Sequence, residues 1–246
     1  MASQLARRGF RPLKKQVLRE LDRRGYELIA GPFAQRVVRA LEYLGVDTVI
    51  DGGANIGQYA QGLRDAGFSG RIFSIEPLSS AFAQLSASAS PDPGWTVERT
   101  AFSDRPGEIT VNISENSVSS SVLPMLAAHS DVAPASVYVS AESAPATTVD
   151  DFVDRHRIVP ARTLLKLDVQ GYENTVFDGA QSTIGDFAAA QIELSYVPLY
   201  DGQWLAAETL SFFESRGYEL WMLDPAVMFD PVTGRTLQCD GVFARQ

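Results

Sequence analysis

Short apolar runs alternate with amphipathic helical patterns along most of the chain. The runs begin at Thr48, Arg71, Trp95, Thr163 and Ala188, and each is followed by polar or turn-forming residues. Continuous apolar runs of this length predict strands that are buried on both faces. The patterns between them predict helices over residues 57–66 and 78–88. Strands that alternate with helices in this way indicate βαβ units and therefore an α/β fold.

The C-terminal part of the chain departs from this alternation. A helix is predicted near residues 203–216, and strands are predicted over 218–223 and 236–243. The residues between the two strands are rich in Pro, Asp and Gly and carry no helical pattern. We therefore expect an antiparallel hairpin that closes the sheet.

The first 45 residues follow a helical pattern instead. One helix is predicted over residues 10–25, with an apolar face and a basic last turn, and a second runs from Pro32 to Gly45. We therefore expect a helical N-terminal extension over residues 1–45 and an α/β domain over residues 46–246.

A glycine-rich loop follows the first strand. It has the pattern Asp51-x-Gly53-x-Asn55-x-Gly57 and leads directly into a helix. Glycines let a backbone turn sharply and approach a ligand closely, and a helix N-terminus offers free N–H groups to a negatively charged group. A dinucleotide fingerprint would need a third glycine where Gln58 stands. The spacing is instead typical of S-adenosylmethionine methyltransferases.

Two later strand ends carry candidate cofactor contacts. Glu76 ends the second strand, where a carboxylate can accept hydrogen bonds from both ribose hydroxyls; the alternative is a surface Glu beside a tight turn. The third strand is predicted over residues 95–102. Ala101 and Asp104 stand at its end, beside the expected position of an adenine, although Asp104 fits a turn-capping role equally well.

The fourth and fifth strand ends carry the candidate catalytic residues. Lys166 and Asp168 lie in the run that begins at Thr163, Glu173 opens the helix that follows, and Glu193 lies in the fifth strand. Ligands bind at the carboxyl ends of strands in doubly wound sheets. Asp168 and Glu193 can therefore share a divalent cation such as Mg²⁺, or one of them can act as general base, with Lys166 and Glu173 as supporting partners. The alternative is that these residues cap helices and form ion pairs with Lys166.

Charge and composition narrow the function classes. The 246-residue chain has a formal net charge of −9, which argues against a nucleic-acid partner. Residues 1–24 are basic, so the first helix either covers the domain or contacts an anionic membrane surface. One cysteine, Cys239, and the lack of a signal peptide or an apolar run of membrane length predict a cytoplasmic protein. The serine-rich residues 114–125 form either a disordered loop or a hydrogen-bonding rim for a hydroxylated substrate.

Taken together, these motifs resemble the FkbM family of methyltransferases. The resemblance runs in order over residues 36–245 and rests on six segments: 49–59, 74–77, 101–104, 114–121, 164–173 and 192–195. It implies a Rossmann-like class I methyltransferase fold, with a seven-stranded, mostly parallel sheet whose last strand is antiparallel. It also implies O-methylation of a sugar or polyketide-like natural product. One departure is Gly52, where many members carry Val.

The resemblance also assigns roles to residues of this chain. It implies that Asp51, Gly53, Asn55 and Gly57 hold the methionine part of S-adenosylmethionine, that Glu76 holds the ribose, and that Ala101 and Asp104 lie at the adenine side. Related methyltransferases of this fold bind a divalent metal through acids at the positions of Asp168 and Glu193. The resemblance thus leaves a metal at this place as an option and does not require one.

Two functions of other classes stay open on the sequence. A nicotinamide-dependent oxidoreductase would also use the glycine loop and Glu76, although Gln58 argues against it. A non-catalytic binding protein would keep the fold and the cofactor without the chemistry. The sequence identifies neither the hydroxyl-bearing acceptor, small molecule or glycan, nor the oligomeric state.

Overall fold

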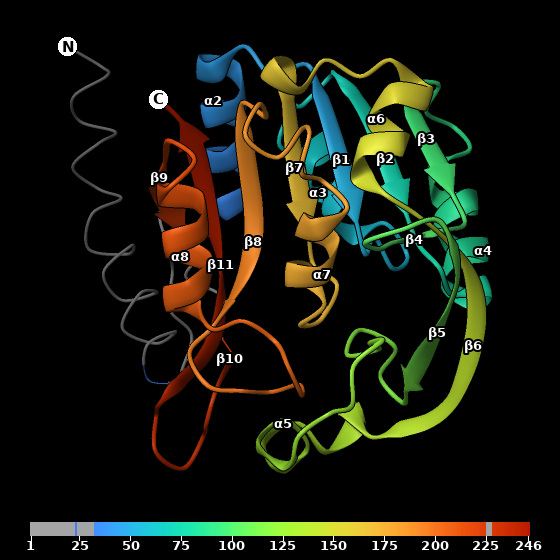
Figure 1. Ribbon diagram of the computed structural model, residues 1–246, viewed down its shortest axis with the longest axis vertical. Coiled ribbons are helices and arrows are strands. Elements are labelled where there is room, and N and C mark those ends of the chain that lie inside the picture. Colours follow the sequence, from blue (N-terminus) through green and yellow to red (C-terminus); the bar gives the residue numbers. More distant parts are fainter. Residues whose placement is uncertain (1–22, 24–31, 225–227) are drawn as a thin grey trace, which may run out of the picture. The chain divides into compact units, whose positions relative to one another are not determined.

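The structure is a computed structural model that describes residue 23, residues 32–224 and residues 228–246 (Figure 1). Apart from residue 23, the helix predicted over residues 10–25 lies outside the described residues. The second predicted helix is confirmed as α2 (Phe33–Leu44), whose buried side chains are Val37, Val38 and Leu41. The helix α2 belongs to the compact unit of residues 33–246, and the predicted domain boundary after residue 45 stays a prediction.

A mainly parallel sheet of eight strands forms the centre of this unit. Its strands are β1 (Thr48–Gly52), β2 (Arg71–Ile75), β3 (Trp95–Glu98), β7 (Thr163–Leu167), β8 (Ala189–Ser195), β9 (Tyr218–Leu223), β10 (Met228–Phe229) and β11 (Thr236–Arg245). The order is β10-β11-β8-β7-β1-β2-β3, and β9 also pairs with β11. Strands β3, β2, β1, β7 and β8 pair in parallel, whereas β11 runs antiparallel to β8, β9 and β10. The predicted fold class and the antiparallel closing hairpin are confirmed.

The sheet has one strand more than the seven expected. The additional strand is β10, which consists of Met228 and Phe229 and pairs with the beginning of β11. Because β11 continues over ten residues, its first part extends past the residues that pair with β9 and leaves backbone groups for β10.

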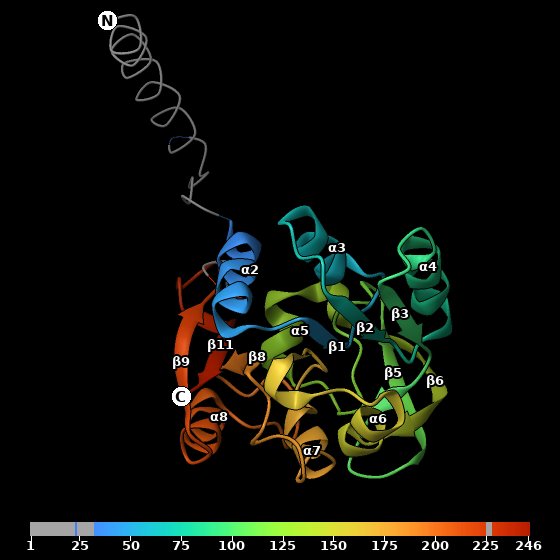
Figure 2. The same ribbon diagram turned by 90° about the horizontal axis from the view of Figure 1, so that it is seen from above.

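Helices cover both faces of the main sheet (Figure 2). On one face lie α2, α3 (Gln58–Asp65) and α4 (Ser79–Ala89), and on the other lie α6 (Val149–His156), α7 (Glu173–Asp178) and α8 (Ala206–Glu214). Each face buries its own apolar cluster. Leu41, Leu63 and Leu85 belong to the first cluster, and Phe152 and Phe213 belong to the second. Burying both faces explains why the parallel strands are nearly continuous apolar runs.

A second, three-stranded sheet branches off after β3. It has the order β4 (Ala101–Phe102), β6 (Tyr138–Thr147), β5 (Gly107–Ser114). The prediction of a single strand over residues 95–102 is therefore wrong, because β3 ends at Glu98 and β4 pairs with β6 instead of β2. Hydrogen bonds to β6 stabilise the pairing of β4 with that strand. The Thr100 hydroxyl donates to the Pro145 carbonyl at 3.0 Å, and the Ser103 N–H donates to the Thr147 carbonyl at 3.0 Å.

The serine-rich residues 114–125 form an ordered rim after β5. The Ser119 and Ser136 hydroxyls lie 3.0 Å apart, and the Ser121 hydroxyl donates to the Gln170 carbonyl at 2.7 Å. The rim leads into α5 (Ala127–Val132) and two short 3-10 turns follow later, η1 (Pro134–Ser136) and η2 (Pro160–Arg162). The structure thus shows this segment ordered by hydrogen bonds within the protein, and its role toward a hydroxylated substrate stays a prediction. Among the helices that the structure describes, none is long and apolar enough to cross a membrane.

Candidate active site

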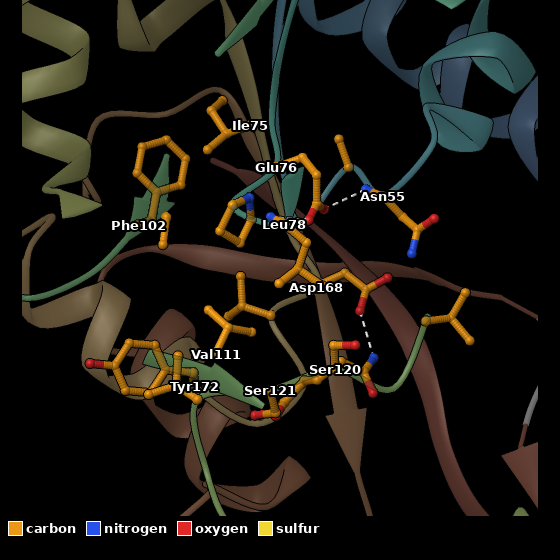
Figure 3. A pocket seen from close by; sticks show the side chains of 18 of the residues that line it. Asn55, Ile75, Glu76, Leu78, Phe102, Val111, Ser120, Ser121, Asp168 and Tyr172 are labelled. Carbon is orange, nitrogen blue, oxygen red and sulfur yellow. Dashed lines mark hydrogen bonds between the residues drawn. The ribbon is translucent and has the colours of Figure 1, made fainter. Parts of the chain in front are cut away.

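A pocket lies at the carboxyl ends of the parallel strands. It is lined by the glycine loop after β1, the residues that follow β2 and β7, the strand β4 and the serine rim (Figure 3). Strand β11 contributes one residue, Asp240. This is the edge at which doubly wound sheets bind their ligands.

Two glycines of the loop, Gly53 and Gly57, are required by packing. Gly53 has a φ of 77°, and a Cβ at this position would lie 1.9 Å from the Asp168 carbonyl oxygen. Gly57 has a φ of 94° and caps α3, and a Cβ there would lie 2.9 Å from Leu85 and Trp95. Gly53 lines the pocket, whereas Gly57 lies behind it. The loop therefore comes close to β7 on one side and to α4 on the other because both positions lack a side chain.

Glu76 is held at the pocket wall by two backbone N–H groups. Its Oε2 accepts from the Asn55 N–H and its Oε1 accepts from the Leu78 N–H, both at 2.8 Å (Figure 3). Burial raises the pKa of Glu76 to about 7, although these two hydrogen bonds favour the charged form. Each carboxylate oxygen keeps a second lone pair. The side chain can therefore still accept hydrogen bonds from a diol in the pocket.

Next to Glu76 the pocket is apolar. Ile75, Leu78, Phe102 and Val111 contribute this part of the lining together with Ala101, which was a predicted site residue. In Figure 3, Phe102 and Ile75 lie on the opposite side of the pocket from Asn55. An apolar wall beside a carboxylate suits a nucleoside, whose base is flat and whose ribose is polar.

The structure does not bring Asp104 into this pocket. Its side chain is 37% exposed, accepts a hydrogen bond from the Ser103 hydroxyl at 3.1 Å and lies 3.8 Å from the Arg105 guanidinium. It belongs to the bend between β4 and β5. Of the two residues predicted at the adenine side, only Ala101 lines the pocket.

Asp51 and Lys166 form a buried ion pair below the pocket. Asp51 is fully buried in β1, and its Oδ1 lies 3.0 Å from the Lys166 Nζ, because the two residues occupy paired positions on β1 and β7. The ammonium also lies 3.6 Å from Asp168 Oδ2 and 5.2 Å from the centre of the Tyr59 ring. Burial opposes the charge on Lys166, but Asp51 and Asp168 outweigh it and raise its pKa. Asp51 does not itself line the pocket, so its contact with a cofactor stays a prediction.

An amide joins the two acids that were predicted as base or metal ligands. The Gln170 Nε2 donates to Asp168 Oδ1 at 2.7 Å and to both oxygens of Glu193 at 3.3 Å. The Gln170 Oε1 accepts from the Tyr200 hydroxyl at 2.7 Å, which fixes the orientation of the amide, and Gln238 donates a further hydrogen bond to Glu193. A hydrogen-bond donor therefore occupies the place between the carboxylates that a cation would need.

This donor set does not support the predicted Mg²⁺ site. Within the part of the chain that the structure describes, no group of three or more His, Cys, Asp or Glu side chains is placed to hold a metal ion. Burial first, and then the charges of Asp168 and Glu173, raise the pKa of Glu193 well above its ordinary value.

The four predicted catalytic residues divide into two pairs. Lys166 and Asp168 line the pocket, and the Asp168 side chain is 36% exposed. Glu193 and Glu173 lie outside the lining. Glu173 is buried at the start of α7 and accepts from the Val169 N–H at 2.9 Å, and burial raises its pKa to about 7. It fixes the turn that follows Asp168.

Several residues of the site, among them Gln170, Tyr59, Gln191 and Asp240, were not singled out from the sequence. The Tyr59 hydroxyl donates to Gln191 Oε1, and the Gln191 Nε2 donates to Asp240 Oδ2, both at 2.7 Å. Tyr59 and Asp240 line the pocket. Burial, and then the charge of Asp168, raise the pKa of Asp240 to about 6. One sequence signal was available, since polar side chains such as Gln191 and Asp240 are unusual in strands that are otherwise largely buried.

Residues 51–220 match the family model described as the methyltransferase FkbM domain. None of the curated proteins compared with the chain matches it.

Solved structures of methyltransferases are similar only at a distance. An rRNA methylase from Streptococcus thermophilus is 12% identical, with 89% of this chain and 99% of that chain covered and a TM-score of 0.46. A precorrin-6y C5,15-methyltransferase from Geobacter metallireducens is 11% identical, with 86% and 87% covered and a TM-score of 0.45. A 1,6-didemethyltoxoflavin-N1-methyltransferase from Burkholderia thailandensis is 10% identical, with 86% and 79% covered and a TM-score of 0.43. Likenesses as low as these say nothing about the acceptor.

The family match covers more than half of the chain and includes the glycine loop, Glu76 and the strand that ends before Asp168. The resemblance noted in the sequence is thereby confirmed. The chain belongs to the FkbM family of S-adenosylmethionine-dependent methyltransferases.

Proposed function

We propose that this methyltransferase methylates a hydroxyl oxygen, and that its acceptor is a polyhydroxylated molecule such as a sugar or a polyketide-like natural product. The observation that carries the proposal is Asp168, a carboxylate that lines the pocket with a side chain 36% exposed. A hydroxyl is a poor nucleophile at neutral pH and needs a group that takes its proton.

The lining fits S-adenosylmethionine on the nucleoside side. Glu76 is placed to accept the ribose hydroxyls, Ala101 and Phe102 offer an apolar wall to the adenine, and Gly53 and Asn55 stand beside the intervening part of the pocket. When bound, the cofactor supplies an activated methyl group on its sulfonium. The residues of this chain then have to align the acceptor and remove one proton.

Asp168 is better placed than Glu193 to take that proton. Its Oδ1 accepts from Gln170, whereas its Oδ2 lies 3.6 Å from the Lys166 ammonium, beyond hydrogen-bond distance. This oxygen is available to an acceptor hydroxyl. Glu193 lies outside the pocket lining and holds the Gln170 amide in position. We therefore assign Asp168 as general base and Glu193 and Glu173 as positioning residues.

The proposal is tested by methyl transfer from S-adenosylmethionine to a panel of sugar and polyketide hydroxyl acceptors. Asp168→Asn should lower turnover by about 10²-fold or more, because a base of this kind contributes that much. Its affinity for S-adenosylhomocysteine should stay nearly unchanged. Asp178→Asn, at an exposed acid at the end of α7, is the matched control and should leave both quantities unchanged.

Three results would contradict the proposal. Unchanged turnover in Asp168→Asn would remove the assigned base. Methylation of amines or carbon acids in the same panel, with no hydroxyl acceptor turned over, would remove the O-methylation. Binding of NADH in place of S-adenosylhomocysteine would show that the cofactor site had been misassigned.

A further inference from the structure

Asp240 reaches the pocket from a strand that carries no recognised cofactor motif. It lies on β11, opposite Glu193 of β8, and lines the same pocket as Glu76. Its Oδ2 accepts from the Gln191 Nε2, and Gln191 is itself held by the Tyr59 hydroxyl. Among the described residues, none makes a hydrogen bond to the other oxygen, Oδ1. One oxygen of the Asp240 carboxylate is thus held by a hydrogen bond, and the other is available to a ligand.

The other two acids of the described lining, Glu76 and Asp168, have partners at both of their carboxylate oxygens. Both oxygens of Glu76 accept backbone N–H groups. Asp168 accepts from Gln170 through Oδ1 and has the Lys166 ammonium 3.6 Å from Oδ2. A cationic group of a ligand at Asp168 would lie close to a second cation. Asp240 has no ion-pair contact with Lys166, so a ligand cation placed there meets less repulsion.

The order of the strands gives the pocket a direction. Glu76 follows β2, and Ala101 comes after β3 in the chain. Lys166 lies in β7, which pairs with β1, and Asp168 follows β7. Asp240 lies in β11, beyond β8 in the sheet. The Glu76 side chain reaches the loop after β1, and the Asp240 side chain reaches β8. Four strand spacings separate β2 from β11 in the sheet, and both carboxylates line the same pocket. A ligand that lies along the pocket therefore has Glu76 on one side and Asp240 on the other.

We propose that Asp240 binds the ammonium group of the methionine part of S-adenosylmethionine. The inference rests on the cofactor placement given in the proposed function, with the ribose at Glu76. An ammonium that enters a partly buried pocket loses water and needs an anion as its partner. Asp240 supplies that anion from the antiparallel strand, and Gln191 and Tyr59 keep its carboxylate in place.

The test is calorimetric titration of the full chain with two ligands. One is S-adenosylhomocysteine, and the other is its analogue in which hydrogen replaces the amino group. Asp240→Asn keeps the shape and an oxygen for Gln191 but removes the charge. It should weaken S-adenosylhomocysteine binding by about tenfold or more, since a hydrogen bond to a charged group is worth that much. Binding of the desamino analogue should be equal in the variant and in the wild type.

Two controls complete the experiment. Asp178→Asn removes an exposed acid away from the pocket and should change neither affinity. Asp240→Glu keeps the charge and should retain a preference for S-adenosylhomocysteine over the desamino analogue. If Asp240→Asn does not fold, the wild type and Asp240→Glu still decide, because both must prefer the ligand that carries the ammonium.

Two outcomes would overturn the inference. Equal affinity of the wild type for both ligands would mean that no residue of the pocket recognises the ammonium. An equal loss for both ligands in Asp240→Asn would mean that Asp240 maintains the shape of the pocket. Failure of the proposed function looks different, because the wild type would then bind S-adenosylhomocysteine without methylating any hydroxyl acceptor, or would not bind it at all.

Discussion

The two sides of the pocket are built by different kinds of hydrogen bond. On the nucleoside side, Glu76 is held by backbone N–H groups, which every non-proline residue supplies. On the acidic side, Asp168 and Glu193 are held by the Gln170 amide, and Asp240 by Gln191. Backbone donors persist when neighbouring side chains change, whereas a side-chain network depends on each member. The nucleoside side is thus the constant part of the site, and the acidic side is the part that substitutions can adjust.

The strongest way to break this contrast is to disturb the glycine loop, whose Asn55 N–H holds Glu76 on the nucleoside side. Gly53→Ala places a Cβ 1.9 Å from the Asp168 carbonyl oxygen at a φ of 77°. We expect the free energy of unfolding to fall by more than about 4 kcal/mol, which is exceptional for one methyl group, and cofactor binding to be lost. Urea unfolding and titration with S-adenosylhomocysteine measure both effects.

The control for this prediction lies in the next helix. Gly62 is inside α3, and a Cβ there would meet nothing within 4 Å. Gly62→Ala should therefore stabilise the protein by about 1 kcal/mol, because alanine is the better helix former. A Gly53→Ala protein as stable as the wild type would show that the loop can move away from β7.

A second prediction concerns the acidic side. Lys166→Met leaves Asp51, which is fully buried, without the ammonium 3.0 Å away. We expect a loss of about 3–5 kcal/mol in the free energy of unfolding, since an uncompensated buried charge costs that much. The double variant Asp51→Asn/Lys166→Met should recover most of the loss in urea unfolding. A single variant within about 1 kcal/mol of the wild type would mean that the pair does not support the sheet.

The third prediction concerns the pH dependence of stability and compares two buried carboxyl groups. Burial raises the pKa of both Glu76 and Glu173 to about 7 from an ordinary 4.5. The folded protein therefore binds each proton more tightly than the unfolded chain does. Each group contributes stability that is fully present below pH 4.5 and is lost as the pH rises through about 7, up to about 3 kcal/mol per group. Glu76→Gln and Glu173→Gln should each flatten this fall between pH 5 and 8.

Cofactor binding then distinguishes the two variants. Glu76 lines the pocket and Glu173 does not. Glu76→Gln should weaken S-adenosylhomocysteine binding by about tenfold, because one acceptor of the ribose is lost, whereas Glu173→Gln should leave it nearly unchanged. If the pH slopes of both variants equalled that of the wild type, burial would not be what controls these carboxyl groups.

The same contrast explains what the sequence allowed us to predict. The glycine loop and Glu76 were predicted because their roles follow from short spacings along the chain and from the ends of recognisable strands. The sheet, the helices on its faces and the closing hairpin followed from periodicity. Asp168 was placed at the pocket by the rule for carboxyl ends of parallel strands.

The relations between distant residues were beyond such reasoning. The ion pair between Asp51 and Lys166 depends on the register of β1 against β7, and the position of Asp240 depends on that of β11 against β8. Register is set by packing and is not encoded in one segment alone. The division of residues 95–102 into two strands likewise depends on β6, which comes more than thirty residues later.

The small sheet of β4, β5 and β6 leaves the domain and returns to it at one place. Phe102 and Thr147 are paired neighbours on β4 and β6, and the Ser103 N–H donates to the Thr147 carbonyl. The residues between them form a segment whose two ends are held side by side, and lengthening such a segment costs little free energy. For protein engineering, residues 104–145 are the segment to exchange between homologues: the exchange would replace the serine rim and Val111 of the pocket lining and would keep Glu76, Asp168 and Phe102.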